Sequence, residues 1–331
     1  MYHGVIDIYK EPGFTSHDVV AKLRGILRQK RIGHSGTLDP AAEGVLPVCL
    51  GQGTRLADMM ADRDKTYEAV LLLGVETDTK DMTGQVLSRH PVDVTEEEVR
   101  QKAASFVGRY EQIPPMYSAL KVNGKKLYEL ARAGKEVERK ARPVEILALS
   151  VDWVDLPRAG LTVTCSKGTY IRTLCHDLGQ ALGCGGAMEH LKRTRVGRFS
   201  WQEAYTLSQI EALRDEGRIG EILIPIEEMF HGPKAIASPM GDKLVLNGNP
   251  VRERDFACVE EADTFQEGPE HTEQAAGQHR QVQAPPRVRI PKKGLVRVYS
   301  SRREFLGVYE YDGSRDWWRP KKMFPRETEG L

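Results

Sequence analysis

The stretch GHSGTLDPAAEGVLPVCLGQGTRL, residues 33–56, places an aspartate in a turn-rich loop that leads directly into an apolar segment. Three glycines and Pro40 bend or restrict the backbone on both sides of Asp39. Residues 45–50 are typical of a buried strand and would give the loop a rigid flank. A carboxylate held there can be aimed and partly desolvated, so Asp39 is the first candidate for chemistry. An ordinary Asp-Pro turn explains the same residues and stays open.

The segments around this loop predict an α+β fold with long connections between strands. Hydrophobic alternation predicts strands over 4–10, 65–74, 142–156 and 160–171. Amphipathic spacing and capping residues predict helices over 17–29 with Ser16 as N-cap, 95–107 with Thr95 as N-cap, 172–183 and 205–217. No glycine-rich nucleotide-binding motif interrupts this pattern.

From about residue 231 the sequence changes to short strand-and-turn units: KAIASP, KLVLNGNPV, GLVRVYSS and EFLGVYEYDG. These units predict a small β-barrel separate from the first domain. Residues 259–286 lie between them; six acidic residues and one arginine occupy 259–281, and bulky aliphatic residues are scarce. We expect this acidic insertion to have no fixed structure. The predicted domains are therefore 1–230 and 231–331.

Opposite charges nearly cancel, with 48 Lys and Arg against 47 Asp and Glu, so net charge indicates no partner. The distribution is uneven, because 121–142 holds eight basic residues against three glutamates and 192–198 holds four and no acid. Two basic clusters on a near-neutral chain suit local contact with a polyanion. Solvated helix faces explain them equally well on charge alone.

Five cysteines form no CxxC or Cys/His pair at metal-binding spacing. An odd count in mostly apolar surroundings predicts reduced thiols, and hence a cytoplasmic protein. The N-terminus lacks the apolar run of a signal peptide, and no window of about 18 apolar residues predicts a membrane span.

Three further residues are candidates for a site. Arg172 follows a predicted strand where a helix begins, and a cation there could pair with a buried carboxylate and keep it ionised. Tyr67 alternates with apolar residues in KTYEAVLLLG, so its ring could stack on a flat ligand or simply end a core stripe. Leu191, in EHLKRTRVG, has the character of a core residue.

Five blocks make the pattern specific: GHSGTLDPAAEGVLPVCLG, KTYEA, PPMYSALKVNGKKLYELARAG, SKGTYIRTLCHDLG and HLKRTRVGRF. In this order and at these separations they resemble the bacterial tRNA pseudouridine-55 synthases of the TruB type, over about residues 4–230. The tail is similar to the PUA-type RNA-binding barrel that many members carry. The resemblance implies a pseudouridine-synthase fold with a mixed, largely antiparallel central sheet, and a PUA-like domain.

The resemblance also implies the reaction and its residues. Uridine 55 in the T loop of tRNA would be turned out of its stack, detached from ribose at N1 and rejoined through C5. Asp39 would be the catalytic carboxylate, Arg172 its ionic partner, and Tyr67 the ring that stacks on the base. Leu191 would be an apolar wall, Tyr170 would lie beside the ion pair, and His34 would contact the RNA. Residues 113–142 would be a mobile insertion that closes over the RNA. Backbone contacts are expected from Lys121, Lys125, Lys126, Arg132, Lys192, Arg193 and Arg195.

The chain departs from the family near its start, where members often read D-K-P-x-G-x-T-S and this sequence reads Y-K-E-P-G-F-T-S. Aligned on Pro12, the family's lysine position is Glu11, and the lysine here is Lys10. One residue along a strand reverses the side chain's direction, so Lys10 is expected to face away from the site.

Two other classes of function fit parts of the pattern. A non-catalytic RNA-binding or tRNA-folding protein would need the basic clusters but not Asp39, Tyr67 and Arg172 together. A glycoside hydrolase would need a second carboxylate partner for Asp39, and none is evident in the five blocks. The sequence therefore predicts a monomeric isomerase that acts on tRNA and requires no metal, nucleotide or other cofactor.

Overall fold

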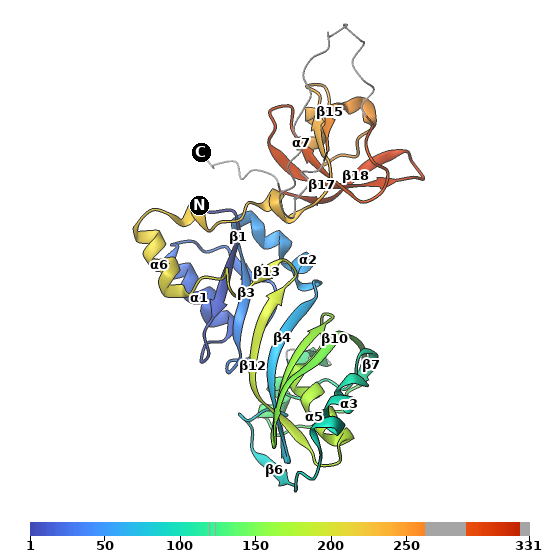
Figure 1. Ribbon diagram of the computed structural model, residues 1–331. Helices are drawn as coiled ribbons and strands as arrows, with labels where there is room; N and C mark the ends of the chain where they lie inside the picture. The colour runs from blue at the N-terminus through green and yellow to red at the C-terminus, as the bar shows by residue number, and fades with distance from the viewer. Residues whose placement is uncertain (119, 123, 262–288, 325–331) are drawn as a thin grey trace, which may run out of the picture. The chain divides into compact units, whose positions relative to one another are not determined.

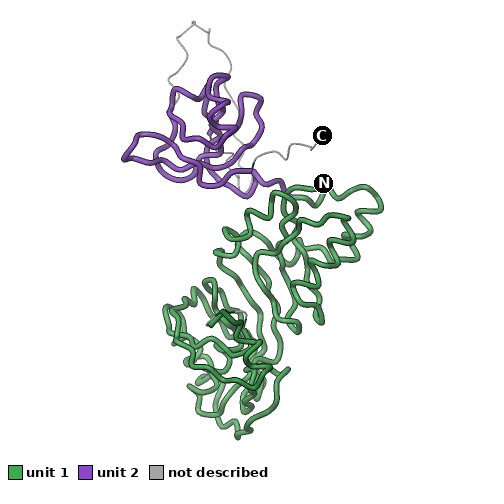
Figure 2. The backbone as a smooth tube through the Cα atoms, turned by 180° about the vertical axis from the view of Figure 1, so that it is seen from behind, with its two compact units in different colours: residues 1–223 green, residues 224–331 purple. Residues whose placement is uncertain are grey.

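The computed structural model describes residues 1–118, 120–122, 124–261 and 289–324. The chain divides into two compact units, Met1–Leu223 and Ile224–Leu331 (Figure 2). Each unit has its own hydrophobic core and is described by itself. Most of the predicted acidic insertion, residues 262–286, lies outside the described residues.

Unit 1 is built on a nine-stranded sheet within the described residues, with the path β1-β3-β12-β4-β11-β10-β7 and with β2 and β13 beside it (Figure 1). The strands are β1 (Gly4–Lys10), β2 (Ile32–His34), β3 (Glu43–Leu50), β4 (Lys65–Leu73), β7 (Gly108–Gln112), β10 (Arg142–Asp155), β11 (Arg158–Cys165), β12 (Gly186–Val196) and β13 (Phe199–Ser200). Only the pair β3–β12 is parallel among them. The predicted mixed, largely antiparallel sheet is confirmed.

Helices cover the sheet over two separate cores. Figure 1 shows α1 (Ser16–Ile26) and α6 (Leu207–Asp215) near β1 and β3, where they share one core. The other core contains residues of α3 (Glu96–Ala104), α5 (Ile171–Ala181), β4 and β11. None of the helices in the described part of the chain is long and apolar enough to cross a lipid bilayer.

The remaining elements of unit 1 are short. They are the 3-10 helices Gly51–Leu56 and Ile219–Glu221, α2 (Ala57–Ala61), the hairpin β5 (Val75–Thr77) and β6 (Val86–Arg89), and the pair β8 (Lys121–Val122) and β9 (Lys125–Lys126) followed by α4 (Leu127–Arg132). The last three lie within the predicted insertion 113–142. That insertion leaves the sheet after β7 and returns to it as β10, which pairs with β7.

The first helix begins one residue earlier than predicted. Thr15, not Ser16, is the N-cap: its hydroxyl accepts from the Asp18 N–H at 3.0 Å and the Asp18 carboxylate accepts from the Thr15 N–H at 2.9 Å. Ser16 is buried, and its hydroxyl accepts from the Leu38 N–H at 2.8 Å. It therefore ties the helix start to the loop that carries Asp39. The N-cap predicted at Thr95 is confirmed, with Glu98 completing the capping box.

Two strand predictions need correction. The strand expected over 160–171 ends at Cys165, and α5 begins at Ile171. Residues 186–196, not predicted as a strand, form β12 between β3 and β4 in the sheet. Four basic residues in 192–198 conceal the period-2 pattern that predicts strands.

Unit 2 has the five-stranded order β15-β14-β16-β17-β18 within the described residues. Its elements are the 3-10 helices Ile226–Met229 and Glu253–Asp255, β14 (Lys234–Ala237), α7 (Asp242–Leu246), β15 (Phe256–Glu260), β16 (Leu295–Tyr299), β17 (Phe305–Asp312) and β18 (Trp317–Met323). The predicted strand unit KLVLNGNPV is wrong, because its first residues form α7, which ends before Gly248 in the left-handed region at φ 65°.

A buried carboxylate in β1 has consequences for stability. Asp7 is 6% exposed and lies opposite Pro47 of β3. Neither carboxyl oxygen has a hydrogen-bond partner among the described residues. Burial raises the pKa of Asp7 to about 8, and the nearby Arg193 cation only partly opposes this shift. Asp7 is therefore protonated in the folded protein at neutral pH.

We expect the free energy of unfolding to fall as pH rises from about 4 to about 8. Across that range the unfolded chain has lost the Asp7 proton that the folded protein retains, so up to about 1.4 kcal/mol is lost per pH unit. Asp7→Asn should remove this contribution and raise Tm at pH 8 more than at pH 5. An equal change in Tm at both values would contradict a protonated Asp7.

Candidate active site

Asp39 lies in the loop between β2 and β3, next to the core that contains Leu38, Tyr67 and Leu191. Its side chain is 38% exposed, so it can be reached from solvent. The loop backbone is held by buried side chains from distant segments. Ser16 binds Leu38 as described above. Arg193 donates to loop carbonyls before Asp39 in the sequence, and Lys10 donates to loop carbonyls after it.

Lys10 corrects the expectation that it faces away from the site. It is fully buried at the end of β1, and its ammonium donates to the carbonyls of Pro40 at 3.2 Å and Ala42. Burial lowers the pKa of Lys10 to about 8, while the negative charge of Asp39 acts in the opposite direction. Glu11 is exposed. The lysine that reaches the Asp39 loop is therefore Lys10.

Arg193 was predicted to contact RNA phosphates, and its position does not fit that prediction. It is 1% exposed in β12. Its Nε donates to the Val45 carbonyl at 2.8 Å, and its terminal nitrogens donate to the carbonyls of Thr37 and Gly36 at 3.4 Å. A Cβ at Gly44 would lie 2.1 Å from the Arg193 carbonyl, so only glycine allows this approach of the two strands. Arg193 fixes the Asp39 loop from inside.

Arg172 joins Asp39 to a second carboxylate. Its Nη2 lies 3.1 Å from Asp39 Oδ2, and its Nη1 lies 3.2 Å from Asp81 Oδ2. Nη2 also donates to the Tyr117 carbonyl at 2.8 Å. The predicted pairing of Asp39 with Arg172 is present in the structure, and Asp81 extends it to a group of three that we call the ion triad.

The two carboxylates of the ion triad differ in environment. Asp81 is 9% exposed, and its Oδ1 accepts from the Thr79 hydroxyl at 2.8 Å and the Thr83 N–H at 3.0 Å. Asp39 is the accessible member. Burial raises the pKa of Asp39, Arg172 limits the rise, and the charge of Asp81 adds to it. One guanidinium therefore neutralises only part of the charge of two carboxylates. Because Asp81 also accepts hydrogen bonds, the negative charge that is not neutralised lies at Asp39.

Asp81 was missed from the sequence. It follows the end of β5 in TDTKDMTG, where threonines alternate with acids. Hydroxyls and backbone N–H groups in such a turn can donate hydrogen bonds to a carboxylate without the help of a cation. That local pattern was the available signal, and the separation of 91 positions between Asp81 and Arg172 hid the pairing.

Tyr67 and Leu191 lie on the adjacent strands β4 and β12, in the same core as Leu38. Both are 7% exposed. Burial raises the pKa of Tyr67, and a hydrogen bond with Arg193 acts against that rise. An aromatic ring and an aliphatic side chain thus lie in the core next to the loop that carries Asp39.

Tyr170 and His34 lie at the edges of this region. Tyr170 is the N-cap residue of α5, and the charges of Arg172 and Asp39 both affect its hydroxyl, whose pKa is raised mainly by burial. His34 ends β2, and burial together with the Arg193 charge lowers its pKa. His34 is therefore neutral near pH 7 in this state.

The other predicted RNA contacts lie on two segments. Lys121, Lys125 and Arg132 are at least partly exposed in the insertion. Lys126 donates to the Tyr128 hydroxyl at 3.1 Å. On β12 and beyond, Lys192 lies 3.2 Å from the centre of the Trp201 ring, and Arg195 is exposed.

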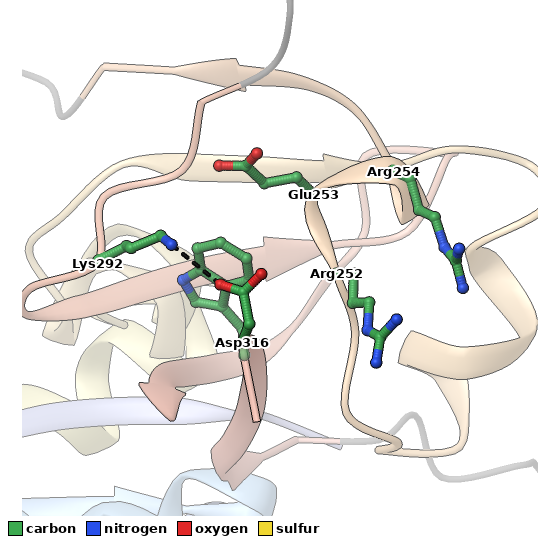
Figure 3. Close-up of a pocket in the computed structure, with 6 residues that line it drawn as sticks. Arg252, Glu253, Arg254, Lys292 and Asp316 are labelled. Carbon is green, nitrogen blue, oxygen red and sulfur yellow. Dashed lines mark hydrogen bonds and ion pairs between the residues drawn. The ribbon is translucent and has the colours of Figure 1, made fainter. Parts of the chain in front are cut away.

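Unit 2 contains a small pocket of its own, lined by Arg252, Glu253, Arg254, Lys292, Asp316 and Trp318. Figure 3 shows Lys292 paired with Asp316, whereas Arg252 and Arg254 extend from one short segment on the other side. Both arginines are exposed. The pocket therefore presents cations to solvent at a polar surface.

No group of three or more His, Cys, Asp or Glu in the described ranges is arranged to hold a metal ion. Asp39 and Asp81, the two carboxylates of the site, are both directed at the Arg172 guanidinium.

Comparison with known proteins identifies the family of the chain. Residues 24–171 match the N-terminal domain of the TruB family of pseudouridylate synthases, and residues 172–231 match the tRNA pseudouridylate synthase B C-terminal domain. The chain is 45% identical to tRNA pseudouridine synthase B of Lachnoclostridium phytofermentans over 331 residues, covering 97% of this chain and 99% of that protein. It is 45% identical to the protein of the same name from Bacillus subtilis over 257 residues, covering 75% of this chain and 83% of that protein.

Solved structures show the same fold. A chain in the crystal structure of a Cbf5-Nop10-Gar1 complex superposes with a TM-score of 0.66 at 25% identity, covering 98% of this chain and 86% of that chain. The matches to both family domains, and to a relative over 97% of this chain, establish the relationship. The chain belongs to the TruB family of pseudouridine synthases.

Proposed function

We propose that this protein converts uridine 55 in the T loop of tRNA to pseudouridine, with Asp39 as the catalytic carboxylate. The ion triad carries the proposal, because it leaves one accessible carboxylate next to the core that contains the Tyr67 ring and Leu191. Relatives named tRNA pseudouridine synthase B support tRNA as the substrate. A protein that only bound RNA would have no need for a carboxylate balanced in this way.

The reaction is an isomerisation. The bond from uracil N1 to C1′ breaks, the bond from C5 to C1′ forms, and the C5 proton passes to solvent while N1 gains one. Two routes are open to an ionised Asp39: attack on C1′, or removal of the C2′ proton to give a glycal. Both need an unprotonated carboxylate, which is the state that Arg172 favours, and both need water to be displaced from it by the bound nucleotide. No net electron transfer occurs, so the chemistry itself requires no redox cofactor.

The target base must leave its stack to reach Asp39. Unstacking costs a few kcal/mol, and contact with the Tyr67 ring and with Leu191 would offset part of it. The detached uracil must also remain in place while it turns and reattaches, which a close apolar pocket favours. We expect Tyr170 and His34 to contact the displaced nucleotide.

The remaining tRNA contacts are assigned by charge. We expect the insertion 113–142 to bind phosphates through Lys121, Lys125, Lys126 and Arg132, and β12 to do so through Lys192 and Arg195. These contacts position the RNA without reading its sequence. In unit 2, a PUA-like RNA-binding role would use exposed cations such as Arg252 and Arg254.

The direct test is incubation of the protein with unmodified tRNA transcript that carries tritium at uridine C5. Release of tritium, together with mapping of pseudouridine to position 55, would support the proposal. Release from another uridine would support pseudouridine synthase activity but would place the modified position elsewhere in the tRNA. Absence of release with a correctly folded protein would contradict the proposed function.

Asp39→Asn should abolish tritium release while leaving tRNA affinity within about tenfold, or about 1.4 kcal/mol. The amide keeps the shape of the side chain but cannot attack C1′ or accept the C2′ proton. Asp152→Asn, on an exposed aspartate of β10, is the control and should retain full activity. Full turnover by Asp39→Asn would remove Asp39 from the mechanism.

Arg172→Lys should lower the single-turnover rate constant by about 100-fold. One ammonium cannot span Asp39 and Asp81 while also donating to the Tyr117 carbonyl, so one carboxylate is left poorly compensated. The matched control is Arg158→Lys, because Arg158 binds Glu189 through two nitrogens on the exposed surface. Equal rates for the two variants would show that the guanidinium geometry is dispensable.

The dissociation constant for tRNA should rise with salt, because bound phosphates release counterions. The double substitution Lys125→Ala and Arg132→Ala should weaken binding. It should also flatten the plot of log Kd against log salt concentration by about 0.7–0.9 for each phosphate that the variant no longer binds. Lys102→Ala, on an exposed lysine of α3, serves as the control. An unchanged slope in the double variant would remove these residues from the RNA interface.

A further inference from the structure

Gln112 is the last residue of β7 and is 1% exposed. Its carboxamide is bonded to both backbone groups of one residue: Oε1 accepts from the Tyr170 N–H at 2.8 Å, and Nε2 donates to the Tyr170 carbonyl at 3.1 Å. Nε2 also donates to the Tyr110 hydroxyl. This side chain therefore takes the place of a strand partner for residue 170, after β11 has ended.

The position of Gln112 joins two parts of the site. The insertion starts at the next residue and ends at Arg142, which pairs with Gln112 in the β7–β10 ladder. Tyr170 is the N-cap residue of α5, and Arg172 lies in the first turn of that helix. One carboxamide thus fixes the base of the insertion to the helix start that carries the guanidinium.

A second contact closes the connection. Nη2 of Arg172 donates to the Tyr117 carbonyl, inside the insertion, at 2.8 Å, and the same nitrogen lies 3.1 Å from Asp39 Oδ2. The Tyr128 N–H in turn donates to the Ser118 carbonyl at 3.1 Å, which links this segment to α4. The position of the guanidinium therefore depends on the start of α5 and on the insertion. Gln112 is bonded to the first and lies at the base of the second.

Paired bonds of this kind can also be purely structural, and the chain offers an example. Gln29 is 5% exposed, accepts from the Tyr2 N–H at 2.8 Å and donates to the Tyr2 carbonyl at 2.9 Å. Its Nε2 also donates to the Arg31 carbonyl at 3.3 Å, and it follows α1 in the region of the other core. Gln29 and Gln112 are therefore both buried, and each bonds to both backbone groups of one tyrosine. They differ in the segment to which they bind.

We propose that Gln112 is a positioning residue for the isomerisation, acting through Tyr170 and Arg172 to keep the guanidinium aligned with Asp39. The inference rests on the proposed function, because the step that it serves is the one that Asp39 catalyses. Misplacement of reacting groups by about 1 Å can reduce a rate by about 100-fold. Loss of the carboxamide should therefore affect catalysis more than RNA binding.

The experiment compares Gln112→Met with Gln29→Met. Methionine keeps the length of the side chain and removes the paired hydrogen bonds to Tyr170 in one variant and to Tyr2 in the other. Three quantities are measured with C5-tritiated tRNA transcript: the single-turnover rate constant, Kd for the RNA, and Tm. We expect a similar loss of Tm in both variants, a rate constant about 10- to 100-fold lower only in Gln112→Met, and Kd within about threefold of the wild-type value in both.

Equal rate constants in the two variants, or a Gln112→Met defect confined to Kd, would overturn the proposal. If Gln112→Met does not fold, Gln112→Glu and Gln29→Glu are compared in the same way, since glutamate keeps the acceptor for the backbone N–H. A crystal structure of the Gln112 variant gives a test that does not depend on turnover. An Arg172–Asp39 separation that stays at 3.1 Å would contradict a positioning role, whether or not the wild-type protein releases tritium.

Discussion

Arg172 is a buried cation that forms ion pairs with two carboxylates, Asp39 and Asp81. The chemistry of the site depends on how far the positive charge of Arg172 neutralises each of them. Asp81 is buried and also accepts hydrogen bonds from Thr79 and Thr83, so its charge is compensated where it lies. Asp39 has Arg172 on one side and solvent on the other. The uncompensated part of the negative charge is therefore at the surface that a substrate can reach. Removing the cation would leave two close anions in a poorly solvated place.

The loop that carries Asp39 is held through its backbone. Lys10 and Arg193 are both buried, and both donate to main-chain carbonyls of the loop rather than to the Asp39 carboxylate. Ser16 fixes Leu38 between them. Because these bonds end on carbonyl groups, they define the position of the loop while the carboxylate itself pairs with Arg172. Rigid support of this kind is what a reacting group needs when small displacements change the rate.

Much of this arrangement could be predicted, because it is encoded in local blocks. The turn-formers around Asp39 and the helix start before Arg172 are adjacent in sequence to the residues that they position. Asp81 and Arg193 were missed or misplaced because their partners are remote. A run of basic residues looks the same whether its cations face solvent or, like Arg193, bind carbonyls more than 100 residues away. For the same reason β12 was not recognised as a strand.

The orientation of Lys10 follows from the pairing of β1 with β3 and not from the position of the proline after β1. Alignment on Pro12 moved the lysine to the wrong face, since one residue along a strand reverses a side chain. The direction of the Lys10 side chain is set instead by β1, whose seven residues all pair with β3. Gly4 pairs with Leu50 at one end, and Lys10 pairs with Gly44 at the other. A proline can move by one position within the turn that follows without shifting those pairs. Lys10 therefore stays against the carbonyls of residues 40 and 42, and the Asp39 loop keeps its support despite the altered turn.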